Sequence, residues 1–236
     1  MSVDTSTLQG SVALAQDGRV VSERRVGSSS SHARTLLTII DGVLTSQSLK
    51  PRDLGALVAT AGPGSFTGLR IGISTVKGLA YGLGIPAVGV PTLDAMASRM
   101  DHPDLQLCPL LDARKSEVYC GFYRCQGERI EKVTEAMVLP PAKLCPMICE
   151  PTLFFGEGAR VYGTFLMKEL GEKARFRGEE GLDSVAVAAA RIGWQSLSGA
   201  GEASPPPKLE LLYVRPSEAE LQRQSRGEKG GPDARC

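Results

Sequence analysis

The sequence has 236 residues, of which 42% are hydrophobic and 22% are charged, so its composition predicts a globular protein and argues against a disordered one. A chain of this length can form one domain or two small lobes, and we expect two lobes. The 27 Lys and Arg residues almost balance the 26 Asp and Glu residues. The sequence therefore lacks the basic excess of proteins that hold nucleic acid on their own.

Targeting and redox features favour the cytoplasm. No apolar run is long enough to span a bilayer, and the start Met1-Ser2-Val3-Asp4 lacks the basic and then apolar pattern of a signal peptide. The six cysteines contain no CxxC pair and have no histidine close by, so we interpret them as reduced thiols. We expect a cytoplasmic protein that does not contact a membrane.

The first half of the chain predicts a β-meander followed by a βαβ unit. Asp17-Gly18 is a hairpin turn signal between two apolar stretches, and the Ser28 to Ser31 cluster is a natural cap for an amphipathic helix. The expected elements are strands at 11–15 and 20–25, a helix over 36–45, a strand at 57–59, a helix over 69–83, a strand at 87–90 and a helix over 94–100.

The second half again predicts mixed α/β structure, and the two halves could be two copies of one layer architecture. Strands are expected at 107–111, 117–124 and 152–155, and helices at 159–170 and 184–198. We place the lobe boundary near His102-Pro103-Asp104, which divides the chain into an N-terminal lobe (1–103) and a C-terminal lobe (104–216). The charged run over 217–236 predicts a disordered tail.

A glycine-rich loop between a predicted strand and a predicted helix is where phosphate-binding loops occur. It lacks the Lys of a Walker loop, it has Thr67 where a dinucleotide fingerprint needs glycine, and it lacks the glycines that a nucleophile elbow needs around Ser65. The alternative is that its glycines allow a tight turn and close helix packing. The loop residues of interest are Gly62, Gly64, Ser65, Thr67, Gly68 and Arg70.

Three further segments follow predicted strands and invite the same comparison. Asp4-Thr5-Ser6-Thr7 suggests the phosphate turn of actin-like ATPases, but no glycine appears until Gly10, and the same residues can form an ordinary Asx or Ser/Thr turn. Asp112-Ala113-Arg114 and Gly156-Glu157-Gly158 can likewise be ordinary turn residues with no binding role.

The two histidines do not form a metal pair. His32 and His102 fall in different predicted regions, so neither an HxxxH site nor a base with a neighbouring ligand can be assembled. We expect His32 to cap or line the first helix and His102 to lie in a loop. No metal ligand and no catalytic residue is assigned.

The helix after the glycine loop has one apolar face and one face of small residues. Ile71, Thr75, Gly78 and Gly82 lie opposite the apolar stripe. Such a helix can pack on its own sheet and admit a second backbone closely, as an intermolecular helix contact requires, or it can be buried within one chain.

Several motifs together carry a family resemblance, which is dense from about Ala61 to Met100 and scattered elsewhere up to Pro216. They are Asp4-Thr5-Ser6-Thr7, His32, the block from Ala61 to Gly72, Lys77-Gly78-Leu79-Ala80, Pro91-Thr92-Leu93, Asp112-Ala113-Arg114, Glu117-Val118-Tyr119 and Tyr213-Val214-Arg215-Pro216. In these segments the chain resembles the TsaB (YeaZ) family. Family members usually have a longer apolar strand before the Asp4 position, so we expect either a short first strand here or a start codon that has been assigned too late.

The resemblance implies an α/β, two-lobed actin/Hsp70/sugar-kinase-like (ASKHA) fold with RNase-H-like lobes, the second of them reduced. It implies a non-catalytic scaffold that activates the paralogue TsaD in making threonylcarbamoyladenosine in tRNA, next to the anticodon. TsaD and the ATPase TsaE are the implied partners, and ATP/ADP and metal are expected in them and not in this chain. tRNA is expected to bind only through the complex.

The resemblance also implies an interface and a remnant of a nucleotide site. The helix pair at about 32–45 and 69–83 is expected to bind TsaD as a heterodimer, or a second copy in isolation, through His32, Leu36, Leu37, Ile40, Leu44, Ile71, Thr75, Gly78 and Gly82. The remnant is the turn Asp4, Thr5, Ser6 and Thr7. The alternatives are an ATP-using or peptidase-like enzyme of the same superfold that acts alone, and a purely self-associating structural protein.

Overall fold

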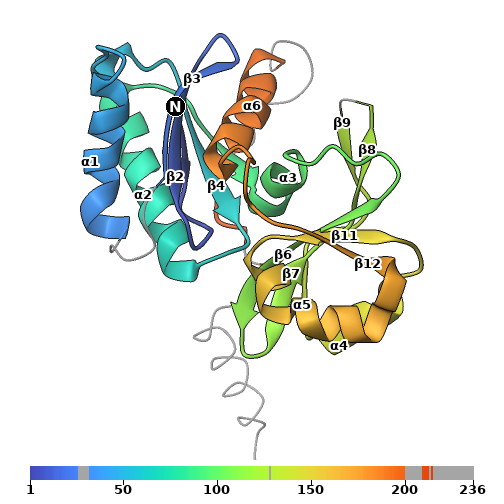
Figure 1. The fold of residues 1–236 in the computed structure, drawn as a ribbon. Helices are drawn as coiled ribbons and strands as arrows, with labels where there is room; N and C mark the ends of the chain where they lie inside the picture. The colour runs from blue at the N-terminus through green and yellow to red at the C-terminus, as the bar shows by residue number, and fades with distance from the viewer. Residues whose placement is uncertain (26–31, 128, 200–208, 213, 215–236) are drawn as a thin grey trace, which may run out of the picture.

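The computed structural model describes the chain except for residues 26–31, 128, 200–208, 213 and 215–236 (Figure 1). The expected tail at 217–236 therefore lies outside the described residues. Among the helices that the structure describes, none is both long and apolar enough to cross a membrane.

The first sheet has five strands in the order β3-β2-β1-β4-β5. The central strand β1 pairs antiparallel with β2 and parallel with β4. Asp17 and Gly18 both have positive φ at the β2–β3 turn, which confirms the predicted hairpin. The strands are β1 (Ser2–Asp4), β2 (Ser11–Gln16), β3 (Arg19–Arg25), β4 (Leu57–Gly62) and β5 (Ala87–Pro91).

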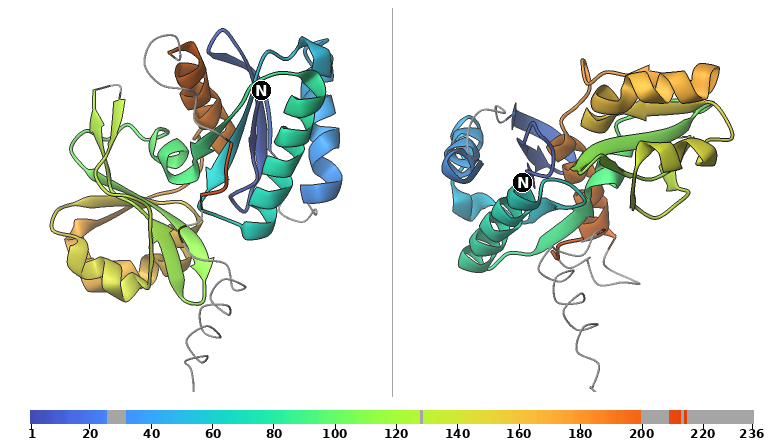
Figure 2. Two further views of the ribbon diagram at one scale, coloured as in Figure 1. Left: turned by 180° about the vertical axis from the view of Figure 1, so that it is seen from behind. Right: turned by 90° about the horizontal axis from the view of Figure 1, so that it is seen from below.

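Helices cover both faces of this sheet (Figures 1 and 2). Along β4 the side chains alternate: Leu57 and Ala59 join the core under α1 and α2, whereas Val58 joins the core with α3 and α6. The helices are α1 (His32–Thr45), α2 (Phe66–Leu83), α3 (Thr92–Ala97) and α6 (Val185–Ser198), and η1 (Pro51–Asp53) leads into β4.

The second sheet repeats the first. Its main path is β10-β7-β6-β11-β12, in which β6 pairs antiparallel with β7 and parallel with β11, as β1 does with β2 and β4. The strands are β6 (Gln106–Arg114), β7 (Glu117–Cys120), β10 (Met137–Leu139), β11 (Thr152–Phe155) and β12 (Ala174–Arg177), with β8 (Tyr123–Gln126) and β9 (Arg129–Lys132) as a side hairpin.

The helices of the second lobe are reduced. The β11–α5–β12 unit matches β4–α2–β5, but only the short α4 and η2 occupy the place of α1. These elements are α4 (Pro141–Leu144), η2 (Cys145–Met147), α5 (Glu157–Leu170) and η3 (Gly171–Lys173). The repeated strand order and the reduced second lobe confirm the two-lobed ASKHA fold class.

The chain returns to the first lobe after building the second. The α6 helix packs on β1, β2 and β4, and the Ala186 N–H donates to the Ser11 hydroxyl at 3.1 Å. Farther on, the Leu212 N–H donates to the Ala61 carbonyl at 2.8 Å, and Leu209 is buried in the core beneath α1 and α2. The first sheet ends before residue 103 and the second begins after it. However, α6 and 209–212 pack with the N-terminal lobe. The division into 1–103 and 104–216 therefore describes the sheets rather than every element.

Candidate functional site

The turn between β1 and β2 is organised by a buried carboxylate. Asp4 is fully buried, and its Oδ1 accepts hydrogen bonds from the Ser6 N–H (2.9 Å), the Ser6 hydroxyl (2.5 Å) and the Thr60 hydroxyl (2.8 Å). Its Oδ2 accepts one from the Thr7 hydroxyl at 2.7 Å. Four donors compensate the desolvated charge, as a buried carboxylate requires. The turn is thus an Asx and Ser/Thr turn, in which the Ser6 hydroxyl donates to Asp4 and the Thr7 hydroxyl has Asp4 and the Gln9 carbonyl oxygen (3.0 Å) as acceptors.

The glycine-rich loop packs directly on this turn. A Cβ atom at Gly64 would lie 2.3 Å from the Ser6 carbonyl oxygen, and one at Gly68 would lie 2.0 Å from the Thr5 carbonyl oxygen. The Ser65 N–H donates to the Ser6 oxygen at 2.8 Å, and the Thr5 hydroxyl donates to the Gly68 oxygen at 2.7 Å. These glycines provide the close packing that we gave as the alternative to a phosphate loop.

The remaining loop residues have separate structural roles before and within the first turns of α2. Ser65 caps the helix, since its Oγ accepts from the Gly68 N–H at 3.2 Å. Gly62 has φ of +110° and packs against the Leu212 oxygen, so it needs the backbone freedom of glycine. Thr67 and Arg70 are exposed, and the Arg70 guanidinium lies 3.8 Å from the centre of the Phe66 ring.

The corresponding turns of the second lobe meet the first lobe through Glu157. The Leu8 N–H donates to Glu157 Oε2 at 3.2 Å, so the start of α5 touches the β1–β2 turn. Burial raises the pKa of Glu157, while the hydrogen bond from Leu8 opposes that rise. At the carboxyl end of β6, Arg114 pairs with Asp112 at 3.2 Å. Asp112-Ala113-Arg114 and Gly156-Glu157-Gly158 are thus parts of one junction between the lobes.

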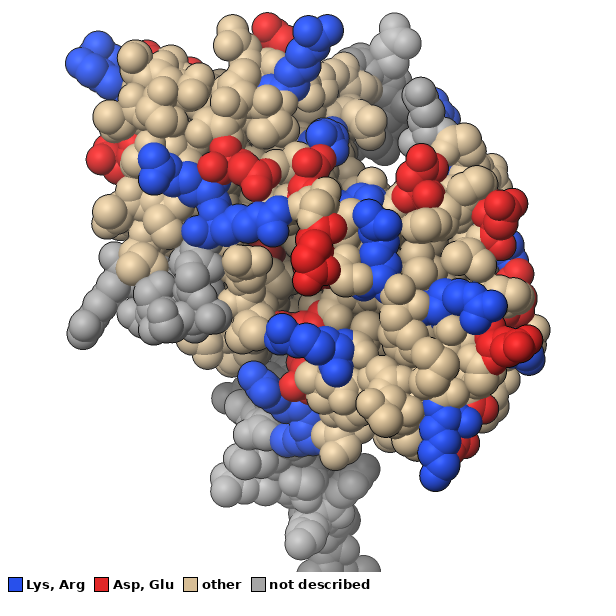
Figure 3. Space-filling model, viewed as in Figure 1, with Lys and Arg blue, Asp and Glu red and all other residues tan. Residues whose placement is uncertain are grey.

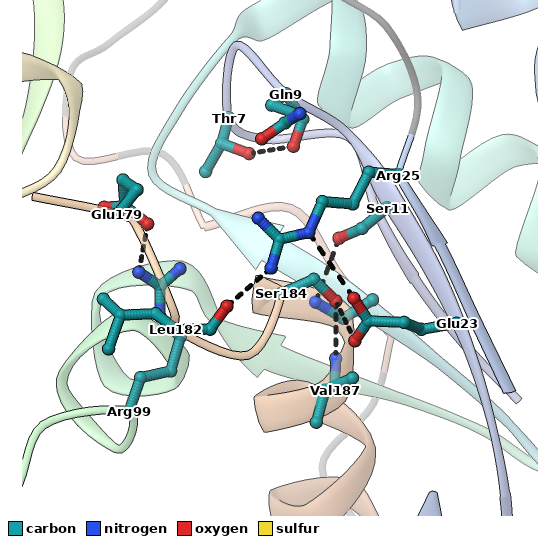
Figure 4. Close-up of polar contacts among 11 residues, drawn as sticks. Thr7, Gln9, Ser11, Glu23, Arg25, Arg99, Glu179, Leu182, Ser184 and Val187 are labelled. Atoms are coloured by element: carbon teal, nitrogen blue, oxygen red, sulfur yellow. Dashed lines mark hydrogen bonds and ion pairs between the residues drawn. The ribbon is translucent and has the colours of Figure 1, made fainter. Parts of the chain in front are cut away.

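A cleft with a volume of about 880 Å³ opens at this junction. Its walls come from the β1–β2 turn, α3, α5 and the segment from β12 to the start of α6. Figure 3 shows acidic and basic side chains side by side along the junction of the lobes. Figure 4 shows the polar network at its base: Arg99 pairs with Glu179, and Arg25 donates to the Leu182 carbonyl oxygen at 2.5 Å.

The structure brings no metal site together in the part that it describes. Within those residues, no group of three or more His, Cys, Asp or Glu side chains is arranged to hold a metal ion. His102 lies in the loop before β6, as expected. His32 begins α1, but its side chain lies outside what the structure describes, so its expected capping role stays a prediction.

The predicted interface residues divide into a core set and a surface set. Leu36, Ile40 and Leu44 are at most 4% exposed, because they form the stripe by which α1 packs on the sheet, so we correct their assignment to an interface. Leu37 is 57% exposed. On α2, Ile71 and Thr75 are partly exposed, Gly78 and Gly82 are exposed, and a Cβ at either glycine would meet no atom within 4 Å. The small-residue face of α2 is therefore external.

Comparison with known proteins decides the family. The model of the family described as "TsaD: tRNA N6-adenosine threonylcarbamoyltransferase" matches residues 25–178. The chain is 30% identical to the tRNA threonylcarbamoyladenosine biosynthesis protein TsaB of Bacillus subtilis over 176 residues, which are 73% of this chain and 77% of that protein. The chain belongs to the TsaB family. The Escherichia coli TsaB is 35% identical over 144 residues, 59% of this chain and 62% of that protein.

A solved TsaB-family structure agrees with the fold. The Pseudomonas aeruginosa protein YeaZ superposes with a TM-score of 0.70 at 26% identity, over 90% of this chain and 97% of that one.

Sequence reasoning nevertheless missed the cleft residues Arg25, Arg99 and Glu179 of this TsaB-family chain. Arg25 ends β3, Arg99 follows α3 and Glu179 lies in a polar loop, so no local pattern distinguished them from solvated surface charges.

Proposed function

We propose that this chain is a non-catalytic scaffold in tRNA threonylcarbamoyladenosine synthesis, where it binds and activates TsaD. The observation that carries the proposal is the exposed small-residue face of α2 in a member of the TsaB family. The curated relatives are named for biosynthesis of this modified nucleoside. The proposal assigns ATP/ADP and metal to TsaD and TsaE, and it lets tRNA bind through the complex, in keeping with a net charge of only +1.

The proposed contact surface consists of Leu37 on α1 and the exposed side of α2. Gly78 and Gly82 lie one turn apart with open space above them, which allows another helix to approach the α2 backbone. Tyr81, 92% exposed, stands beside them as a large side chain that a partner can cover. The same surface supports a homodimer when TsaD is absent.

The test is Gly82→Leu. Because the new side chain projects outward, the monomer should fold with unchanged or greater stability, since Leu is favoured over Gly in a helix by roughly 0.5 to 1 kcal/mol. TsaD affinity should fall by roughly tenfold or more, about 1.4 kcal/mol, because the bulk separates the two helices. Reconstituted tRNA modification should fall with it.

The matched control is Glu169→Leu, which places the same side chain on the exposed part of α5 in the second lobe. This variant should bind TsaD normally. Unchanged TsaD affinity in a folded Gly82→Leu protein would remove α2 from the interface. Sedimentation of both variants without TsaD reports whether the same face forms the homodimer.

The alternative of an enzyme acting alone has its own test. The purified chain should neither hydrolyse ATP nor cleave peptides above a buffer control. Robust activity that disappears on Asp4→Ala would overturn the scaffold proposal, provided the variant remains folded. The hydrogen bonds of the Ser6 and Thr7 hydroxyls to Asp4 support the scaffold, because they give these hydroxyls a role in stabilising the turn.

A further inference from the structure

The cleft between the lobes combines an apolar wall with an excess of positive charge. Its volume of about 880 Å³ is within the range of small-molecule sites. Met167 and Phe176 on its wall are 49% and 37% exposed, so they present apolar surface to the cleft. The lining includes five basic side chains, Arg25, Arg99, Arg160, Lys168 and Arg177, and three acidic ones, Glu157, Glu179 and Glu180.

Arg99 is a buried charge in this cleft whose hydrogen bonds are incomplete. Its side chain is 3% exposed, and it pairs with Glu179, whose side chain is 47% exposed. The Arg99 Nε has no hydrogen-bond partner in the described part of the chain. A buried guanidinium with an unmet N–H is costly, and a guanidinium binds carboxylates and phosphates best when two parallel N–H groups donate together.

Glu179 is placed to give way to another anion. It lies in the segment between β12 and α6, beside Gly178 and two residues before Gly181, which has φ of +73°. Arg25 holds the same segment farther along through the Leu182 oxygen, as Figure 4 shows. Glu179 can therefore turn toward water while the segment stays attached to the first lobe.

We propose that this cleft binds a small organic anion, a carboxylate or phosphate group on an apolar body, which replaces Glu179 on Arg99. The anionic group accepts hydrogen bonds from the Arg99 guanidinium, and the apolar body lies against Met167 and Phe176. The site is separate from the α2 surface proposed for TsaD, since none of its lining residues comes from α1 or α2. Failure of one proposal leaves the other intact.

The test uses phenyl phosphate and benzoate as probes, titrated into the full chain by calorimetry at constant ionic strength. Both should bind, whereas inorganic phosphate should bind more weakly and neutral benzyl alcohol not at all. The tighter of the two aromatic anions identifies the anionic group. Equal affinity for inorganic phosphate and phenyl phosphate would overturn the role of the apolar wall, and no binding of either aromatic anion would overturn the site.

Variants locate the binding. Arg99→Gln should weaken phenyl phosphate binding roughly tenfold or more, because a charge-assisted fork is lost. Glu179→Gln should strengthen it, since the competing carboxylate is removed. The matched controls are Arg124→Gln and Glu150→Gln, which change an ion pair outside the cleft and should leave affinity unchanged.

Two exposed positions keep the test decisive if Arg99→Gln does not fold. Met167→Ser should weaken phenyl phosphate binding but not inorganic phosphate binding, and Glu179→Gln should still raise affinity. Weaker binding by Glu179→Gln would show that Glu179 helps to hold the ligand and does not compete with it. That result would overturn the replacement step.

Discussion

Gly68→Ala tests whether the glycine-rich loop is required for packing. Gly68 is buried in the first turn of α2, and a Cβ added there would lie 2.0 Å from the Thr5 carbonyl oxygen. This contact is about 1 Å shorter than the 3.0 Å below which Cβ contacts essentially never fall. The clash involves backbone, so no side-chain rotation relieves it, and either α2 or the β1–β2 turn must move.

The expected loss of stability follows from what that movement breaks. Overpacking of a close contact costs roughly 1 to 3 kcal/mol. Displacing Thr5 also strains its hydrogen bond to the Gly68 oxygen, a loss of roughly 0.5 to 1.5 kcal/mol. We expect a total of roughly 2 to 4 kcal/mol, which for a chain of this size lowers Tm by roughly 5 to 15 °C.

The matched control is Gly78→Ala on the same helix. A Cβ there meets nothing within 4 Å, so the substitution should stabilise the protein by roughly 0.5 to 1 kcal/mol through helix propensity alone. Urea denaturation of the two variants and the wild type measures both effects. A Gly68→Ala protein as stable as wild type would refute the packing explanation and reopen a ligand-binding role for the loop.

Three further perturbations test the junction of the lobes, the returning chain and the segment 217–236. Burial raises the pKa of Glu157, so the folded protein binds this proton more readily than the unfolded chain. The stability of the wild type relative to Glu157→Gln should therefore improve as the pH falls from neutral, through the raised pKa, to the ordinary pKa of 4.5. A difference in urea midpoint between the two proteins that does not change with pH would contradict the raised pKa. Leu209→Ala should lower the free energy of unfolding by roughly 2 to 4 kcal/mol, because it leaves a cavity beneath α1 and α2. Equal stability of Leu209→Ala and wild type would show that 209–212 does not support the first lobe. Deletion of 217–236 should leave Tm unchanged.

Long elements with a clear period were predictable from the sequence. The apolar stripe from Leu69 to Leu83 predicted α2, and the Asp17-Gly18 signal predicted the first hairpin. The expected strand over 117–124 is instead two strands, β7 and β8, which separate at Gly121-Phe122. Strands β9, β10 and β12 were missed because they are only three or four residues long, and much of their residue pattern is polar or partly exposed.

The candidate sites were harder to predict because they depend on long-range contacts. The family resemblance implied an interface on α1, and Leu36, Ile40 and Leu44 were assigned to it although they belong to the apolar stripe that forms the core. The Arg99 pair with Glu179 joins residues 80 positions apart in the sequence. Only the return of the chain through β12 and α6 brings them together.

The repeated architecture explains why the cleft carries charge where it does. Equivalent strands of the two lobes, β1 and β6, each carry an aspartate at or near the carboxyl end: Asp4 is the last residue of β1, and Asp112 lies two residues before the end of β6. In the first lobe the Asp4 carboxylate is neutralised by hydroxyl and backbone donors, and in the second lobe Asp112 pairs with Arg114. Both acidic groups are thus compensated locally, and the cationic side chains of the cleft come from other parts of the two lobes. Arg25 ends β3 and Arg99 follows α3, whereas Arg160 and Lys168 lie on α5 and Arg177 ends β12. A ligand that contacts basic side chains of both lobes would bind between them, so its binding would depend on their relative position and not on either turn alone.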